Sequence, residues 1–208
     1  MPEFDPATVI LTNRFDAAYL FAADLHRDQR RKGTGTPYLG HLLQVAGLVI
    51  EAGGDEDTAI AALLHDAIED QGGAAMRDAI AARFGERVAR VVVGCSDAIG
   101  SPKPPWRARK QAHIDRMPHE PPTVRLVVTA DKLHNTRAIT ADYRRQGEAL
   151  WLIFHGRRDG TLWYLHAMTA ALVAADPDAP LLVELRAAVA ELDRLVGATA
   201  KIGPPPQG

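Results

Sequence analysis

The sequence has little cysteine and no long apolar segment. Cys95 is its one cysteine among 208 residues, which excludes an intrachain disulfide framework and a cysteine-rich zinc site. No apolar run approaches the roughly 18 residues that a membrane-spanning helix needs, so we expect no membrane span. The first residues lack a basic stretch followed by an apolar one, so we expect no signal peptide. These absences favour a cytoplasmic protein.

The sequence also lacks a charge excess of either sign. Its 24 lysines and arginines face 26 aspartates and glutamates, for a formal net charge of −2. This balance gives no sign of a protein that coats nucleic acid, and no recognition-helix or aromatic-basic pattern occurs, so we expect no nucleic-acid partner. A homo-oligomer is compatible with the sequence, although no pattern indicates one. Hydrophobic residues make up 47% of the chain, which is enough for a sizeable core.

Strand-like alternation is scarce, and apolar residues recur at spacings of three and four, which is typical of helices. The pattern therefore predicts an all-α fold, a single compact domain of about 8–10 helices over residues 1–198. The tail 199–208, "TAKIGPPPQG", is predicted to be a loose end. The helices are expected near residues 12–29, 38–52, 55–70, 74–84, 86–98, 104–117, 121–143, 146–156, 160–175 and 180–196.

The segment "ALLHDAIED", residues 62–70, places four ionisable side chains in an otherwise apolar stretch: His65, Asp66, Glu69 and Asp70. Lone buried charges are costly unless they are paired or coordinate a metal. An imidazole beside a carboxylate is a plausible half of a divalent metal site.

Two other segments offer the second half of such a site. His41 lies at the start of an amphipathic helix in "PYLGHLLQVAGLVI", and Asp131 follows an apolar run in "VRLVVTADKLHN". Two imidazoles and two carboxylates neutralise one divalent cation and leave coordination positions open for water and a phosphate oxygen. Manganese, iron, zinc and cobalt all suit this set of ligands.

Four blocks, "HRDQRRKGTGTPYLGH", "AALLHDAIED", "ARFGERVARVVVGCSD" and "TADKLHNTRAI", occur in an order and at gaps that resemble a known family. They resemble the hydrolase domain of the RelA/SpoT family within the HD superfamily of metal-dependent phosphohydrolases, and most of all its stand-alone members, the small alarmone hydrolases. The resemblance covers residues 14–145 and fades over the C-terminal helices at 146–198. It implies an all-helical fold, usually a manganese ion, and removal of pyrophosphate from the 3′ position of (p)ppGpp.

The resemblance also implies roles for individual residues. Those that match the metal ligands are His41, His65, Asp66 and Asp131. The acidic pair that orients or deprotonates the attacking water is matched by Glu69 and Asp70. Residues that match the nucleotide-binding positions are Arg31, Lys32, Asn135 and Arg137. Lys103, Arg107, Arg109 and Lys110 form a further basic cluster, for which we expect a solvated face rather than contact with the outer phosphates.

Two alternatives stay open at this point. One is an HD phosphohydrolase that acts on another nucleotide, such as (p)ppApp, the 2′-phosphate of NADPH or a nucleoside monophosphate. The other is a nucleotide-sensing module without catalysis, which the intact "HDAIED" segment disfavours. The ligand set does not distinguish guanine from adenine, or tetraphosphate from pentaphosphate. The product distinguishes the reactions, because the alarmone reaction releases pyrophosphate and the phosphatase reactions release orthophosphate.

Overall fold

The computed structural model describes residues 10–100 and 102–202, and over these residues it is built from helices, with one isolated bridge between Arg30 and Pro37. The predicted all-α fold is confirmed. The helices are α1 (Asn13–Leu25), α2 (Leu39–Glu51), α3 (Glu56–Leu64), α4 (Ala67–Gln71), α5 (Gly73–Phe84), α6 (Glu86–Cys95), α7 (Trp106–Arg116), η1 (Met117–His119), α8 (Pro122–Gln146), η2 (Gly147–Ile153), α9 (Arg157–Ala175) and α10 (Leu182–Ile202).

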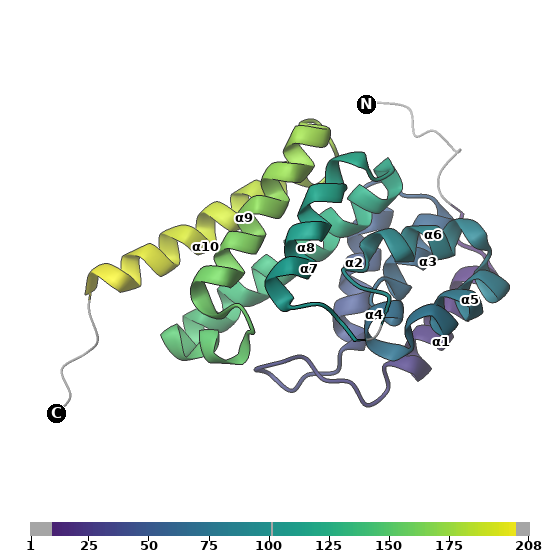
Figure 1. Ribbon diagram of the computed structural model, residues 1–208, viewed down its shortest axis with the longest axis horizontal. Helices are drawn as coiled ribbons and strands as arrows, with labels where there is room; N and C mark the ends of the chain where they lie inside the picture. The colour runs from purple at the N-terminus through teal and green to yellow at the C-terminus, as the bar shows by residue number, and fades with distance from the viewer. Residues whose placement is uncertain (1–9, 101, 203–208) are drawn as a thin grey trace.

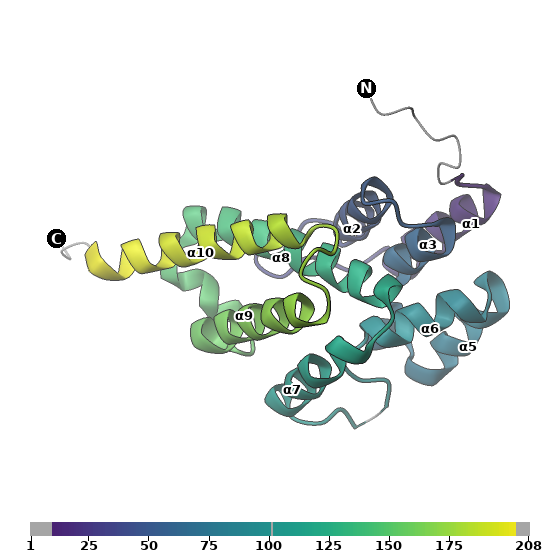
Figure 2. The same ribbon diagram turned by 90° about the horizontal axis from the view of Figure 1, so that it is seen from above.

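Helix α8 is the centre of the arrangement. It packs against α2, α3 and α6 on one side and against α9 and α10 on the other. In Figure 1 the N-terminal helices fill the right of the molecule, and α9 and α10 extend to the left. Figure 2 shows α10 and α9 running beside the same end of α8, with α7 next to α9. A residue near the middle of α8 therefore faces elements from both halves of the chain.

The predicted helix at 55–70 is interrupted at its most polar point. Asp55 caps α3 by accepting a hydrogen bond from the Thr58 amide, as its acidic start predicts. The helix then ends at Leu64, and a turn at His65 and Asp66 separates it from α4. Both side chains are bound elsewhere: His65 Nδ1 lies 2.8 Å from the Ala62 carbonyl oxygen, and Asp66 accepts a hydrogen bond from the Tyr38 hydroxyl. The expectation of one continuous helix is therefore wrong.

The core has two parts. The larger part gathers fully buried residues of α2, α3, α6 and α8, such as Leu42, Ile60 and Leu133. The smaller part lies between α8, η2, α9 and α10 and includes Trp151. Helix α10 continues to Ile202, and residues 203–208 lie outside the described residues, so the loose tail at 199–208 stays a prediction. Among the described helices, none has the length and apolar character to cross a membrane.

Candidate metal centre

Four side chains from three parts of the fold converge at one point. His41 comes from the first turn of α2, His65 and Asp66 from the turn after α3, and Asp131 from the middle of α8. His41 Nε2 lies 3.3 Å from Asp131 Oδ1, and His65 Nε2 lies 3.0 Å from Asp66 Oδ2. The cross distances are 3.7 Å from His41 to Asp66 and 3.8 Å from His65 to Asp131. The structure therefore brings together all four residues that the sequence predicts as metal ligands.

The two rings present their Nε2 atoms to this point because their Nδ1 atoms are engaged elsewhere. A carbonyl oxygen only accepts, so the contact with Ala62 places the proton of neutral His65 on Nδ1 and leaves a lone pair on Nε2. That Nε2 is buried and has no hydrogen-bond partner. His41 Nδ1 lies 2.8 Å from His134 Nδ1, and we assign the donor role to His41, which leaves its Nε2 free as well.

The four groups shift one another's pKa values, although burial outweighs Asp131 at His41 and lowers the pKa of that ring. Burial opposes ionisation of Asp66, but the adjacent His65 ring outweighs it and holds the pKa of Asp66 well below its usual range. Burial also opposes ionisation of Asp131, and Lys132 and the two rings hold its pKa low. Burial lowers the pKa of His65, yet the two carboxylates raise it to about 9. The two carboxylates thus favour a positive charge at His65 Nε2, the ring nitrogen that faces them.

This donor set fits a divalent cation. One ligand atom from each of His41, His65 and Asp66 lies within 4.8 Å of the others, and Asp131 adjoins both rings. Two neutral imidazoles and two carboxylates satisfy the preferences of several divalent transition metals. A cation at this point would take the lone pair of His65 Nε2, which is buried beside Asp66 Oδ2 and makes no hydrogen bond.

The acidic pair of α4 lies beside this centre and behaves differently. Burial raises the pKa of Glu69 and of Asp70, and the negative charge of Asp66 adds to the rise in both. Gln29 Nε2 donates to Asp70 Oδ2 at 2.7 Å, and Gln29 Oε1 lies 2.6 Å from His26 Nδ1. Both acids line the same cavity as the metal centre. They are therefore placed to exchange a proton with a molecule bound there.

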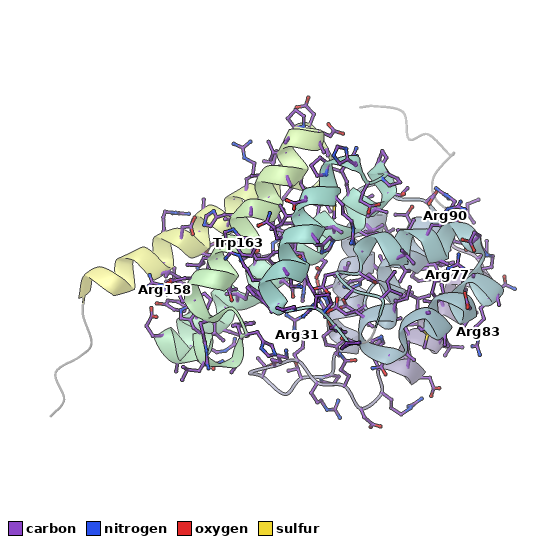
Figure 3. The ribbon with its side chains drawn as sticks, in the orientation of Figure 1. Arg31, Arg77, Arg83, Arg90, Arg158 and Trp163 are labelled. Atoms are coloured by element: carbon purple, nitrogen blue, oxygen red, sulfur yellow. The ribbon has the colours of Figure 1, made fainter. Side chains whose placement is uncertain are left out.

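A cavity of about 390 Å³ opens above the metal centre. Arg31, Lys32 and Asn135 line it, as the sequence predicts, and Arg31 Nη2 donates to Asn135 Oδ1 at 3.1 Å. In Figure 3 Arg31 lies at the lower centre of the molecule, far from the outer arginines labelled on α5 and α6. Arg137 is exposed on α8 and does not contribute to the lining, so its role stays a prediction.

Several lining residues escape the sequence reasoning. Lys132 pairs with Asp131 at 2.6 Å, and both Lys132 and Lys110 lie over the ring of Tyr164. The Tyr164 hydroxyl contacts His113 Nδ1 at 3.1 Å. Burial lowers the pKa of His113 to about 2, and the nearby lysines and Arg116 contribute. The sequence could have indicated Lys132, because it directly follows the predicted ligand Asp131 in "TADKL". No spacing pattern marks His113 or Tyr164.

The basic cluster of residues 103–110 divides into two groups. Lys103 and Arg107 are exposed, as a solvated face predicts. Arg109 and Lys110 instead turn inward, with side chains 13% and 18% exposed, and both bind Asp97. Because α7 lies against α9, its inward face forms part of the cavity wall.

Comparison with known proteins agrees with this geometry. The family model described as HD domain matches residues 18–162. The chain belongs to the HD-domain family. This HD domain is 40% identical over 120 residues to guanosine-3′,5′-bis(diphosphate) 3′-pyrophosphohydrolase MESH1 of Mus musculus, a match covering 56% of this chain and 64% of the relative. It is 41% identical over 125 residues to guanosine-3′,5′-bis(diphosphate) 3′-pyrophosphohydrolase of Aquifex aeolicus, covering 59% of this chain and 17% of that protein.

A solved structure extends the likeness over most of the fold. It is described as a metazoan ortholog of SpoT that hydrolyzes ppGpp, and it matches 92% of this HD-domain chain and 99% of its own chain. The TM-score is 0.73 at 26% sequence identity. The predicted resemblance to RelA/SpoT-type hydrolases is thereby confirmed. By sequence, the match still spans less than two thirds of the length of the mouse relative.

Proposed function

We propose that this protein hydrolyses guanosine 3′-diphosphate alarmones, (p)ppGpp, to GDP or GTP and pyrophosphate, with manganese as its divalent metal. The observation that carries the proposal is the convergence of two histidines and two aspartates beneath a cavity that also holds an acidic pair and a basic loop. The printed names of the mouse and Aquifex aeolicus relatives give this activity for those proteins. A cytoplasmic location is part of the proposal.

Metal binding falls to His41, His65, Asp66 and Asp131. When bound, a divalent cation polarises the phosphoryl group and lowers the pKa of water. Tyr38 holds Asp66 in place through its hydroxyl. The Ala62 carbonyl orients the ring of His65 in the same way. These outer contacts keep the ligand atoms aimed at the cation site.

The acidic pair handles the proton. Glu69 accepts it from the attacking water, and Asp70, held by Gln29, assists. The water oxygen attacks the phosphorus that is bonded to the ribose 3′ oxygen, the bond between this phosphorus and the 3′ oxygen breaks, and the 3′ oxygen takes up a proton. The products are the 3′-hydroxyl nucleotide and pyrophosphate. The raised pKa of both acids suits proton transfer, because a base of higher pKa accepts a proton more readily.

The basic loop binds the nucleotide. Arg31 and Lys32 present positive charge to the cavity, and Asn135 fixes the Arg31 guanidinium. A guanidinium binds phosphate oxygens in a bidentate manner and stacks on planar bases. Lys110 and Lys132, which also line the cavity, add charge for further phosphates.

The test is incubation of the purified protein with manganese and ppGpp, with products resolved by anion exchange. We expect GDP and pyrophosphate in equal amounts, and neither product from Asp66→Ala. The same assay with ppApp and NADPH measures the competing substrates. If NADPH is hydrolysed with release of orthophosphate and ppGpp is not hydrolysed, the proposed substrate is wrong. Metal-dependent phosphohydrolysis would then still hold for this protein. Replacing manganese by iron, zinc or cobalt tests the metal.

A further inference from the structure

Asp97 is a buried carboxylate that holds two cations. It lies just after α6, and its side chain is only 1% exposed. Its Oδ1 binds Arg109 Nη1, and its Oδ2 lies 2.7 Å from Lys110 Nζ. Both cations belong to α7, so this single side chain links the segment after α6 to the inward face of α7.

Glu69 lies close to Arg109, one of these two cations, and to Lys103, but forms only long ion pairs with them. Arg109 Nη1 is 3.6 Å from Glu69 Oε1, and Lys103 Nζ is 3.8 Å from it. Both distances exceed an ordinary charge-assisted hydrogen bond of about 2.8 Å. Lys103 donates to the backbone oxygen of Glu69 instead, at 2.8 Å. Within the described part of the chain, the Glu69 carboxylate makes no hydrogen bond, so its oxygens are available to a substrate water.

We propose that Asp97 is a positioning residue of this site: by binding Arg109 and Lys110, it keeps both cations from forming a direct hydrogen bond with the carboxylate of Glu69. The inference rests on the proposed function, in which Glu69 takes the proton of the attacking water. A guanidinium shared between two carboxylates moves to the one that retains its charge. When Asp97 is neutral, Arg109 needs to move less than about 1 Å to bind Glu69 directly.

The consequence for Glu69 follows from charge. A carboxylate paired with a guanidinium is a weaker base, because the pair stabilises the ionised form. The groups that face Glu69 are Lys110 and Arg109 from α7, Lys103 from the loop before it, Asp97 after α6 and Asp66 before α4. Burial raises the pKa of Glu69, Lys110 lowers it, and the negative charges of Asp97 and Asp66 raise it. Asp97 thus supports the basicity of Glu69 both directly and by holding Arg109.

The kinetic test compares Asp97→Asn with wild type on ppGpp and manganese. We expect kcat to fall about tenfold or more, because general base catalysis contributes roughly 10²- to 10⁴-fold. KM should change far less. Asp97→Glu, which keeps the charge, should recover most of the rate. Adding Arg109→Gln to Asp97→Asn should also raise kcat, because the freed guanidinium is then gone. A residue with a merely structural role would leave the double variant as impaired as Asp97→Asn.

The matched control is Asp57→Asn. Asp57 also joins two cations, Arg14 at 2.7 Å and Arg87 at 3.1 Å, but on the outer surface near the start of α3. Its loss removes a bridging carboxylate without touching the cavity, so kcat should equal that of wild type. A similar fall in kcat for Asp57→Asn and Asp97→Asn would overturn the proposal, since the effect would then reflect stability.

A second measurement needs no turnover. The carboxyl carbon of Glu69 is followed by ¹³C NMR through a pH titration of the metal-free, full-length chain, with Glu69→Gln to assign the signal. In Asp97→Asn the midpoint should move to lower pH, and in the double variant with Arg109→Gln it should move back up. A midpoint that does not move in Asp97→Asn overturns the proposal even if ppGpp is hydrolysed. A midpoint that moves supports it even if the substrate is another nucleotide.

Discussion

Two sides of the cavity have opposite effects on the pKa of a buried histidine. The candidate metal centre is called the floor here, and the inward face of α7 with the lysines around Tyr164 is called the wall. His65, on the floor, is buried beside Asp66 and Asp131, which raise its pKa to about 9. His113, on the wall, is also buried, yet burial, Lys132 and the other nearby cations lower its pKa to about 2. Both rings have an Nε2 without a hydrogen-bond partner. Burial lowers the pKa of both rings, and at His65, but not at His113, neighbouring carboxylates outweigh it.

The difference assigns the two surfaces to different partners. The floor concentrates negative charge within a few ångströms, which suits a metal ion. The wall and the basic loop present Lys110, Lys132 and Arg31 to the same space, which suits phosphate groups. A substrate that carries several phosphates and is hydrolysed at one of them needs both surfaces at once. The following variants break or sharpen that contrast, from the largest expected effect to the smallest.

Removal of the floor's central carboxylate should have the largest effect. Asp66→Ala deletes a proposed metal ligand that adjoins both His65 and His41. We expect hydrolysis of ppGpp to fall at least about 10³-fold, because a catalytic metal supplies several kcal/mol of stabilisation. Metal content measured by elemental analysis should fall in parallel. An active Asp66→Ala protein with a full complement of metal would remove Asp66 from the ligand set.

Glu69→Gln should prevent proton transfer from the attacking water and leave the metal site unchanged. We expect kcat to fall roughly 10²- to 10⁴-fold, the usual range for a general base. Metal content should stay at the wild-type level, because Glu69 is not one of the four proposed metal ligands. Since ionised Glu69 is the active form and its pKa is raised, wild-type kcat should increase with pH through this pKa. Near-normal turnover by Glu69→Gln would assign the proton to Asp70 or to another group.

Arg31→Ala should weaken substrate binding at the basic side of the cavity. The guanidinium lines the cavity and is held by Asn135. Loss of a charged hydrogen bond costs about 1.5–3 kcal/mol, so KM should rise about 10- to 100-fold with metal content unchanged. Arg90→Ala, at an exposed position on α6, is the matched control and should leave KM unaltered (Figure 3). An equal effect of both variants would mean that Arg31 acts only through net charge.

The smallest effect concerns stability and His113. The folded protein holds this ring neutral down to a pKa of about 2, whereas an unfolded histidine titrates near about 6.5. The unfolded state therefore binds the proton first, and stability falls as the pH drops below about 6.5, by up to about 1.4 kcal/mol per unit. Urea unfolding of the metal-free protein at pH 7 and pH 5 measures this. His113→Gln should reduce the loss, and an unchanged loss would exclude His113 as its source.

Much of the site is predictable because its residues conflict with their surroundings. His65, Asp66 and Asp131 stand out in apolar segments, where an unpaired charge is costly. The continuous helix expected at 55–70 is wrong because helix periodicity does not register the tertiary contacts of His65 and Asp66 that accompany the turn. The sequence places Asp97 at the end of the helix expected at 86–98 and Lys110 in a basic cluster expected to face solvent, since nothing local shows that α7 folds its inner face onto the cavity.

The sequence by itself predicted the helical class and the four candidate metal ligands, because these follow from apolar spacing and from charges placed where a core is expected, and its family resemblance added the acidic pair. Only the tertiary structure decided which histidines face carboxylates and which face lysines, and which cations Asp97 holds near Glu69. Those pairings join residues far apart along the chain, across α2, α6, α7, α8 and α9. Electrostatic interactions depend on distances of a few ångströms, and packing alone sets these.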